Sequence, residues 1–346
     1  MPGRGESRLS YRPELDALRG VAVLLVVGSH AGVPGMGYAG TVGVTVFFVL
    51  SGWLITRLLL AEHARSGRID LPLFWQRRAR RILPALLGLL FVWSLLGVVS
   101  GNARVASPRA VVGALLFVNN WLAVPGDLGA LNHTWSLAVE EQFYLVWPLL
   151  VTCCLIRGRR SWVRNLAAAG IAVSVIEKAL LLMSGAPWGR IYYGTDTRMD
   201  ALLWGCFLAT LAPPSSRGWR RAAVAAAALA VPLLGWAPGA RGDLWAPPLA
   251  AAVLAGAFIQ ATVHGTATWI RPPWLVHVGR RSYGLYLWHH AVMTRLLLGS
   301  HGMHRVALTV VLLAVSWALA EASWHLLEKR ALTRRPQASA ARAVEA

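Results

Sequence analysis

The sequence predicts an all-α protein that is integral to a membrane. Of its 346 residues, 56% are hydrophobic and only 14% are charged, whereas soluble domains carry about 25% charged residues. Mean hydropathy is +0.51. Apolar runs, most of them 14 to 22 residues long, follow one another along the chain, and this length matches a hydrocarbon layer of about 30 Å. The gaps between the runs leave no room for a soluble domain.

Eleven apolar stretches are candidate helices. They fall near residues 18–31, 40–60, 83–99, 105–123, 135–156, 162–182, 199–211, 221–236, 248–264, 282–298 and 306–327. Eleven crossings would put the two ends of the chain on opposite sides of the membrane.

The basic residues favour ten crossings instead. Suppose that 105–123 is re-entrant or interfacial and does not cross. The loop Lys and Arg residues then number 24 on the cytoplasmic side and 6 on the outer side, in agreement with the positive-inside rule. We therefore predict about ten transmembrane helices with both termini cytoplasmic, in a multi-pass protein of the inner (plasma) membrane. Residues 1–330 form one membrane domain, and 331–346 form a short, basic, disordered cytoplasmic tail.

Composition also excludes some partners. The net charge of +19 does not indicate nucleic acid, because the basic residues form short clusters and no continuous face. The lipid bilayer is the expected partner for them. The three cysteines lie inside apolar stretches without zinc spacing, so we expect no metal site.

Two ionisable residues in the first stretch are costly in a membrane and therefore candidates for function. Arg19 and His30 are 11 residues apart. Three helical turns take about 10.8 residues, so both side chains share a face, about 16 Å apart along the axis. Asp16 lies one turn before Arg19 and can pair with it. Taken alone, the pair is explained as well by an arginine that reaches the headgroups and a buried polar histidine.

Two adjacent carboxylates, Glu140 and Glu141, lie near the start of the stretch 135–156. Glu140 is about two turns inside the helix, beyond the range in which the helix dipole stabilises an acidic residue. Tyr144, one turn further on, shares its face and can hydrogen-bond it. A functional role for Glu140 is therefore favoured.

Four arginines in five positions precede the stretch 83–99: Arg77, Arg78, Arg80 and Arg81. Membrane orientation requires fewer, and guanidinium groups bind phosphate through paired hydrogen bonds. The cluster predicts a site for a phosphorylated donor at the inner face. Binding of anionic lipid headgroups is the alternative.

Other polar motifs have ordinary explanations. The sequence from Thr197 to Asp200 matches a helix capping box, which would account for Asp200. The pair His289–His290 lies inside an apolar run, where packing and hydrogen bonding are commoner roles than chemistry.

In combination, these motifs resemble the acyltransferase-3 family of integral membrane O-acyltransferases. The resemblance covers residues 11 to about 330. It rests on six blocks in the family's order: Tyr11 to His30, 40–55, Arg77 to Pro84, Trp135 to Tyr144, Thr197 to Gly205 and Ser282 to His289. One block alone would be weak, but six in order are specific.

The resemblance implies roles for residues of this chain. Arg19 and His30 match the family's essential Arg-x10-His pair, and Glu140 its carboxylate, so these three would be catalytic. Arg77, Arg78, Arg80 and Arg81 would bind acyl-CoA. Supporting roles would fall to Asp16, Glu141, Tyr144, His133, Arg198, Asp200 and His289.

The chain departs from the family at two positions. Thr45 stands where the family usually has Asp, which removes a possible partner of the basic site, and Ala291 stands where Pro is usual.

The expected reaction transfers an acyl group, with acetyl as the default. The donor is acyl-CoA, a co-substrate and not a tightly bound cofactor. The acceptor is a hydroxyl of a glycan, a glycolipid or a secreted small molecule. His30 acts as general base or carries the acyl group transiently. A transporter of an acyl donor or a lipid-linked sugar is the alternative, although the inverted repeats typical of transporters are not found.

Overall fold

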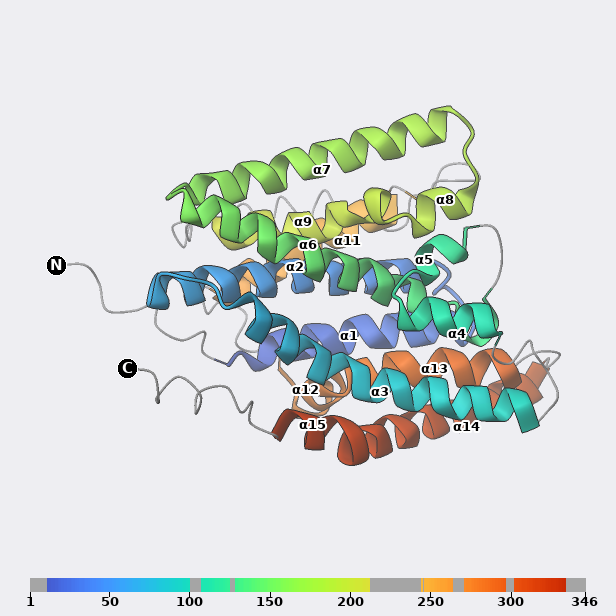
Figure 1. Ribbon diagram of the computed structural model, residues 1–346. Helices are drawn as coiled ribbons and strands as arrows, with labels where there is room; N and C mark the ends of the chain where they lie inside the picture. Colours follow the sequence, from blue (N-terminus) through green and yellow to red (C-terminus); the bar gives the residue numbers. More distant parts are fainter. Residues whose placement is uncertain are drawn as a thin grey trace.

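The computed structural model describes residues 11–99, 107–124, 128–211, 244, 246–263, 271–296 and 302–333. Over these residues the chain is all-α, with helices joined by turns, and contains no strand, as predicted. The helices form a bundle with their long axes roughly aligned (Figure 1). The start of α1 and the end of α15 lie at the same end of this bundle, the left-hand end in Figure 1.

The elements follow one another in a single bundle. In chain order they are α1 (Pro13–His30), α2 (Ala39–Ser66), α3 (Leu71–Val99), α4 (Pro108–Leu115), α5 (Asn119–Leu122), a 3-10 turn (Gly129–Leu131), α6 (Thr134–Ile156), α7 (Arg160–Met183), α8 (Trp188–Tyr193), α9 (Thr195–Thr210), α11 (Ala246–Val263), α12 (Pro273–Arg280), α13 (Ser282–Leu296), α14 (Gly302–Ser323), a π-helical turn (Trp324–Glu328) and α15 (Lys329–Thr333).

Five described segments are long and apolar enough to cross a membrane: α2, α3, α6, α7 and Ala307–Thr333. Helices α1, α9 and α13 are shorter, with 18, 16 and 15 residues. The expected stretch 221–236 and most of the tail 331–346 lie outside the described residues. The chain is thus a helical membrane protein, and ten crossings remain a prediction.

The stretch 105–123 is broken within its described part. Helices α4 and α5 have 8 and 4 residues, and an eight-residue helix is only about 12 Å long. Ser107 caps α4 by accepting from the Ala110 N–H. Between the two helices, Phe117 has a left-handed backbone, φ 54°, which is rare for a bulky residue. Neither helix is long enough to cross.

Side-chain amides attach this broken segment to the bundle. Gln142 of α6 donates to the Phe117 carbonyl at 2.7 Å and to Asn120 at 2.9 Å. Asn119 donates to the Ala110 carbonyl and to Thr134. The bonds to the Phe117 and Ala110 carbonyls satisfy backbone groups that would be costly if left unpaired within a membrane.

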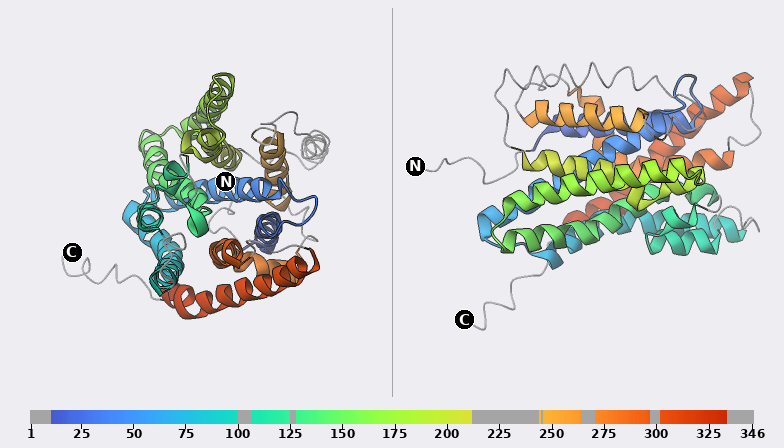
Figure 2. Two further views of the ribbon diagram at one scale, coloured as in Figure 1. Left: turned by 90° about the vertical axis from the view of Figure 1, so that its right-hand side faces the viewer. Right: turned by 90° about the horizontal axis from the view of Figure 1, so that it is seen from above.

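Helix α2 forms the centre of the bundle, and α7 lies at its edge. Of the 18 residues in the most apolar part of α2, 67% are buried, against 17% for the same part of α7. A helix that is apolar on all sides, as α2 is here, is typical of the centre of a bundle. Figure 2 shows α7 and α14 at opposite edges with α2 between them. Two glycines let α2 and α9 approach closely, as is common between membrane helices: a methyl group on Gly52 would strike the Leu202 carbonyl, and one on Gly205 the Val49 carbonyl.

Candidate functional site

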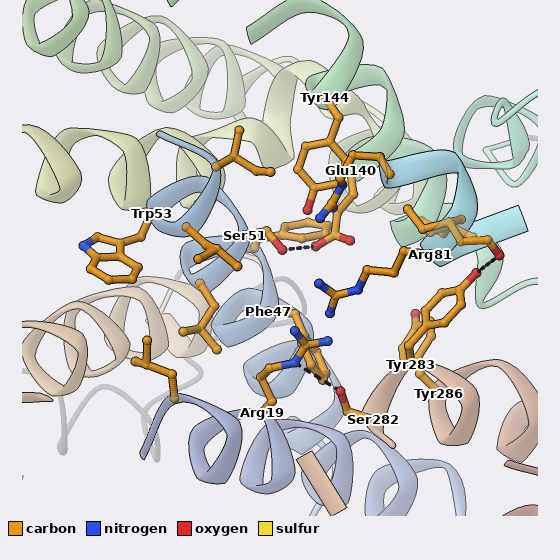
Figure 3. A pocket seen from close by; sticks show the side chains of 18 of the residues that line it. Arg19, Phe47, Ser51, Trp53, Arg81, Glu140, Tyr144, Ser282, Tyr283 and Tyr286 are labelled. Carbon is orange, nitrogen blue, oxygen red and sulfur yellow. Dashed lines mark hydrogen bonds between the residues drawn. The ribbon is translucent and has the colours of Figure 1, made fainter. Parts of the chain in front are cut away.

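A cavity of about 510 Å³ lies among α1, α2, α3, α6 and α13. Four arginines and two carboxylates line it: Arg12, Arg19, Arg78, Arg81, Asp16 and Glu140. Figure 3 shows Arg19, Arg81 and Glu140 pointing into one common space from three different helices. Four positive groups against two negative ones make the cavity suited to an anionic ligand.

The four arginines of 77–81 are divided between two faces of one helix. They belong to α3, which begins at Leu71 and not near residue 83 as the apolar pattern predicted. Arg78 and Arg81 are three residues apart, share a face and line the cavity. Arg77 is exposed and lies 3.4 Å from Glu62, and Arg80 is not among the lining residues. Only two of these four arginines, Arg78 and Arg81, therefore line the cavity.

Glu140 is bound by a residue that the sequence analysis did not single out. The Ser51 hydroxyl donates to its Oε1 at 2.7 Å, whereas the described hydrogen bonds include none from Tyr144, the predicted partner, to Glu140. Tyr144 instead lies under Arg78, whose guanidinium carbon is 3.8 Å from the ring centroid. Glu141 does not line the cavity, and within the described chain its buried Oε1 has no hydrogen-bond partner.

Asp16 also has a different partner from the one predicted. It lines the cavity but pairs with Arg280 of α12 at 3.6 Å and accepts from the Tyr11 hydroxyl at 2.8 Å. Partial burial raises the pKa of Tyr11 above its ordinary value, while the hydrogen bond from Arg280 opposes this rise. Arg19 contacts Ser282 of α13, with its Nε 3.3 Å from the hydroxyl. The expected Asp16–Arg19 pair is absent among the described ion pairs.

His30 lies in a second cluster, composed of four imidazoles. Its Nδ1 is 3.0 Å from Nε2 of His289, and the His290 ring stands edge-on to it, with centroids 4.8 Å apart. His133 stacks on His290, also at 4.8 Å. His30 is exposed, while His289 and His133 are buried. We refer to these four residues as the histidine cluster.

Arg19 and His30 contact the same neighbouring helix, α13. Arg19 bonds Ser282 and His30 bonds His289, and both partners belong to α13. The two residues therefore share one face of α1, but only Arg19 lines the cavity. His30 is the last residue of α1, toward the opposite end of the bundle from the start of α1 (Figure 1).

Tyr286 connects the cavity with the histidine cluster. It lines the cavity, donates to the His133 carbonyl at 2.9 Å and has its ring centroid 5.7 Å from that of His289. Ser136 bonds the same hydroxyl. This tyrosine thus contacts the histidine cluster from the wall of the cavity.

Arg198 and Asp200 lie outside both clusters. Arg198 is buried between the rings of Phe48, Trp135 and Tyr192, and its Nη2 is 3.4 Å from the Thr45 hydroxyl. The position at which the family usually has Asp therefore faces Arg198, and Thr45 is not a cavity residue.

Asp200 is paired and does not cap a helix. Its Oδ2 lies 2.7 Å from Nζ of Lys178 on α7. Helix α9 begins at Thr195 with Gly194 as its N-cap. The capping box predicted over Thr197 to Asp200 is therefore wrong.

Several site residues were missed from the sequence although they lie in the matched blocks. Ser51 binds Glu140, Ser282 binds Arg19, and Tyr283 and Tyr286 are cavity residues three positions apart on α13. For His290, the apolar run around it predicts only packing and hydrogen bonding. The i, i+3 spacing of the two tyrosines was the available signal, because it places both on one helical face.

Comparisons with known proteins identify the family of the chain. A family model described as "Acyltransferase domain" matches residues 12–321. The chain is 31% identical to O-acetyltransferase OatA of Staphylococcus aureus (strain NCTC 8325 / PS 47) over 350 residues, which cover 92% of this chain and 57% of that protein. It is 32% identical to the putative O-acetyltransferase SAR0937 of Staphylococcus aureus (strain MRSA252) over 318 residues, covering 83% of this chain and 51% of the relative.

The chain thus spans little more than half the length of these relatives. No solved structure matches it. The family model covers nearly the whole chain, including α1 to α13 and most of α14. The chain is therefore a member of the acyltransferase-3 family.

Proposed function

We propose that this chain transfers an acyl group, most simply acetyl, from acyl-CoA to a hydroxyl of a glycan, a glycolipid or a secreted small molecule. The observation that carries the proposal is the arginine-lined cavity, joined through α13 to an exposed histidine. The O-acetyltransferase names of the relatives support the same reaction class.

Acyl-CoA would enter from the end of the bundle at which α1 begins. Ten crossings in an inner membrane, with both termini cytoplasmic, would make this the cytoplasmic end. Arg19, Arg78 and Arg81 would bind the phosphates of the coenzyme by charge-assisted hydrogen bonds. Arg77 is exposed, and neither it nor Arg80 lines the cavity, so the proposed donor site does not include these two arginines. Glu140, held by Ser51, would orient the bound donor.

The acceptor would approach His30 from the opposite, outer end. His30 removes the proton of the acceptor hydroxyl as a general base, and the oxygen attacks the thioester carbonyl carbon. A C–O ester bond forms, the C–S bond breaks, and the imidazolium returns the proton to the coenzyme A thiolate. Because a thioester is already activated, positioning and proton transfer are the main requirements.

The proposal is tested with membranes that contain the wild-type chain, His30→Asn, Arg78→Gln or Arg77→Gln. They are incubated with acetyl-CoA labelled in the acetyl group, and label is counted in base-labile ester products. Wild type and Arg77→Gln are expected to form ester, and His30→Asn to form almost none. Equal ester formation with His30→Asn would remove His30 from the chemistry. Transport of acetyl-CoA across the membrane of vesicles that contain the protein, without ester formation, would favour the transporter instead.

A further inference from the structure

The hydrogen bonds of the histidine cluster determine which nitrogen of each ring carries the proton. Nδ1 of His289 is 3.0 Å from the Leu285 carbonyl. A carbonyl only accepts, so Nδ1 of His289 carries a hydrogen. In a neutral imidazole the other nitrogen is then a bare acceptor. Nε2 of His289 is therefore free to accept.

The bare nitrogen of His289 determines the protonation of His30 in turn. It lies 3.0 Å from Nδ1 of His30. Two bare nitrogens do not bond each other, so Nδ1 of His30 must donate, and Nε2 of His30 is left without a proton. The second nitrogen of a histidine is commonly set in this way by the bond that the first one makes.

Two neighbours hold the plane of the His30 ring. His289 is fully buried, at 0% exposure, and is anchored one helical turn back by its bond to Leu285. The His290 ring stands at 85° to that of His30 and its Nδ1 contacts the Ala130 carbonyl at 3.1 Å. The His30 ring is thus oriented from two sides although it is itself exposed.

We infer that His289 is a positioning residue: it fixes His30 in the Nδ1-protonated form, so that Nε2 of His30 is the nitrogen that takes the acceptor proton. The inference rests on the proposed function and adds the identity of the reacting nitrogen. When Nε2 takes a proton, the new positive charge is stabilised through the N–H···N bond to His289. Simple packing of His289 would require none of these bonds.

A spectroscopic experiment tests the inference without any turnover. The protein is labelled with 15N-histidine and studied in bilayers, with His30 and His289 assigned from His30→Asn and His289→Gln. Nδ1-protonated, Nε2-bare signals are expected for both residues, with a 15N–15N coupling across the bond from Nδ1 of His30 to Nε2 of His289. A proton on Nε2 of either residue in the neutral protein would overturn the inference.

Kinetics with matched variants gives a second test. The side-chain oxygen of glutamine can replace Nε2 as acceptor, so His289→Gln is expected to retain most of the activity. His289→Leu still fills the space of the ring with an apolar side chain but removes the hydrogen-bond acceptor for Nδ1 of His30. In this variant kcat is expected to fall about 10- to 100-fold, while the KM for acetyl-CoA stays unchanged. Equal losses in both variants, or no loss in either, would overturn the positioning role.

The two proposals fail in different ways. A wild-type protein that forms no ester with any acceptor contradicts the proposed function, whatever the nitrogen spectrum shows. An active wild-type protein with the other His30 tautomer contradicts only the role of His289.

Discussion

At the scale of single residues, the helical phase of α3 separates arginines that are adjacent in sequence. Arg78 lies over the Tyr144 ring and lines the cavity, while Arg77 is on the outer face beside Glu62. A charge-assisted hydrogen bond contributes about 1.5 to 3 kcal/mol, but an exposed ion pair contributes about 0 to 1 kcal/mol. Neighbouring guanidiniums should therefore differ greatly in importance.

We predict that Arg78→Gln raises the KM for acetyl-CoA by about 10- to 150-fold, the equivalent of one charge-assisted bond. Arg77→Gln is the matched control and should stay within about 3-fold of wild type because its pair is exposed. Initial rates against donor concentration measure both. Similar KM values for the two variants would show that the cavity is not the donor site.

Arg198 provides a prediction about stability. It is 3% exposed, its Nε has no partner within the described chain, and its Nη2 donates to the neutral Thr45 hydroxyl at 3.4 Å. Thr45→Asp supplies a carboxylate, which should stabilise the fold by about 1.5 to 3 kcal/mol. Thr45→Asn is the neutral control of nearly equal size. Unfolding in detergent measures the change, and a Thr45→Asp protein no more stable than Thr45→Asn would contradict it.

At the scale of elements, α2 and α9 depend on a reciprocal glycine contact. Gly52 faces the Leu202 carbonyl and Gly205 faces the Val49 carbonyl, both without space for a methyl group. Cys206 also places its thiol 3.4 Å from the Gly52 carbonyl. Because α9 carries Arg198 and α2 carries Ser51, a shift between these helices would disturb both the aromatic box around Arg198 and the cavity.

We predict that Gly52→Ala destabilises the protein by about 1 to 3 kcal/mol, the usual cost of overpacking. Gly37→Ala is the control, since a methyl group there meets nothing within 4 Å. Thermal unfolding of the two purified variants provides the comparison. Equal melting temperatures would mean that α2 and α9 can move apart to accommodate the methyl group at little cost in free energy.

The limits of sequence-based prediction also show at this scale. Helical periodicity predicted that Arg19 and His30 share a face, because that relation is internal to one helix. It did not predict that Asp16 pairs with Arg280 or Asp200 with Lys178, because these partners are on helices brought together by packing. It also placed the start of α3 after the arginines, since hydropathy marks the apolar part of a helix and not its polar first turns.

At the scale of the whole molecule, the proposed donor and acceptor sites lie toward opposite ends of the bundle. The turn between α2 and α3 lies at the end where α1 begins, and the turn after α7 lies at the other end (Figure 1). Exposed serines are present at both turns, Ser66 and Ser184. They allow the predicted orientation to be tested by single substitutions.

In a chain whose three cysteines are replaced by alanine, we predict that Ser184→Cys reacts with a membrane-impermeant maleimide in intact cells. Ser66→Cys should react only after permeabilisation, because the positive-inside rule places its loop in the cytoplasm. Gel-shift labelling measures both. The reverse pattern would place the arginine cavity on the outer side and contradict entry of acyl-CoA from the cytoplasm.

The position of Tyr286 has a consequence for the membrane as a barrier. An open aqueous path from the arginines to exposed His30 would carry protons down the electrochemical gradient and dissipate the energy stored there. The Tyr286 ring lines the cavity and contacts the His289 ring, and its hydroxyl is bonded to Ser136 and to the His133 carbonyl. In the proposed reaction the acyl group would have to pass this ring, which would help the bilayer to remain impermeable to protons during transfer.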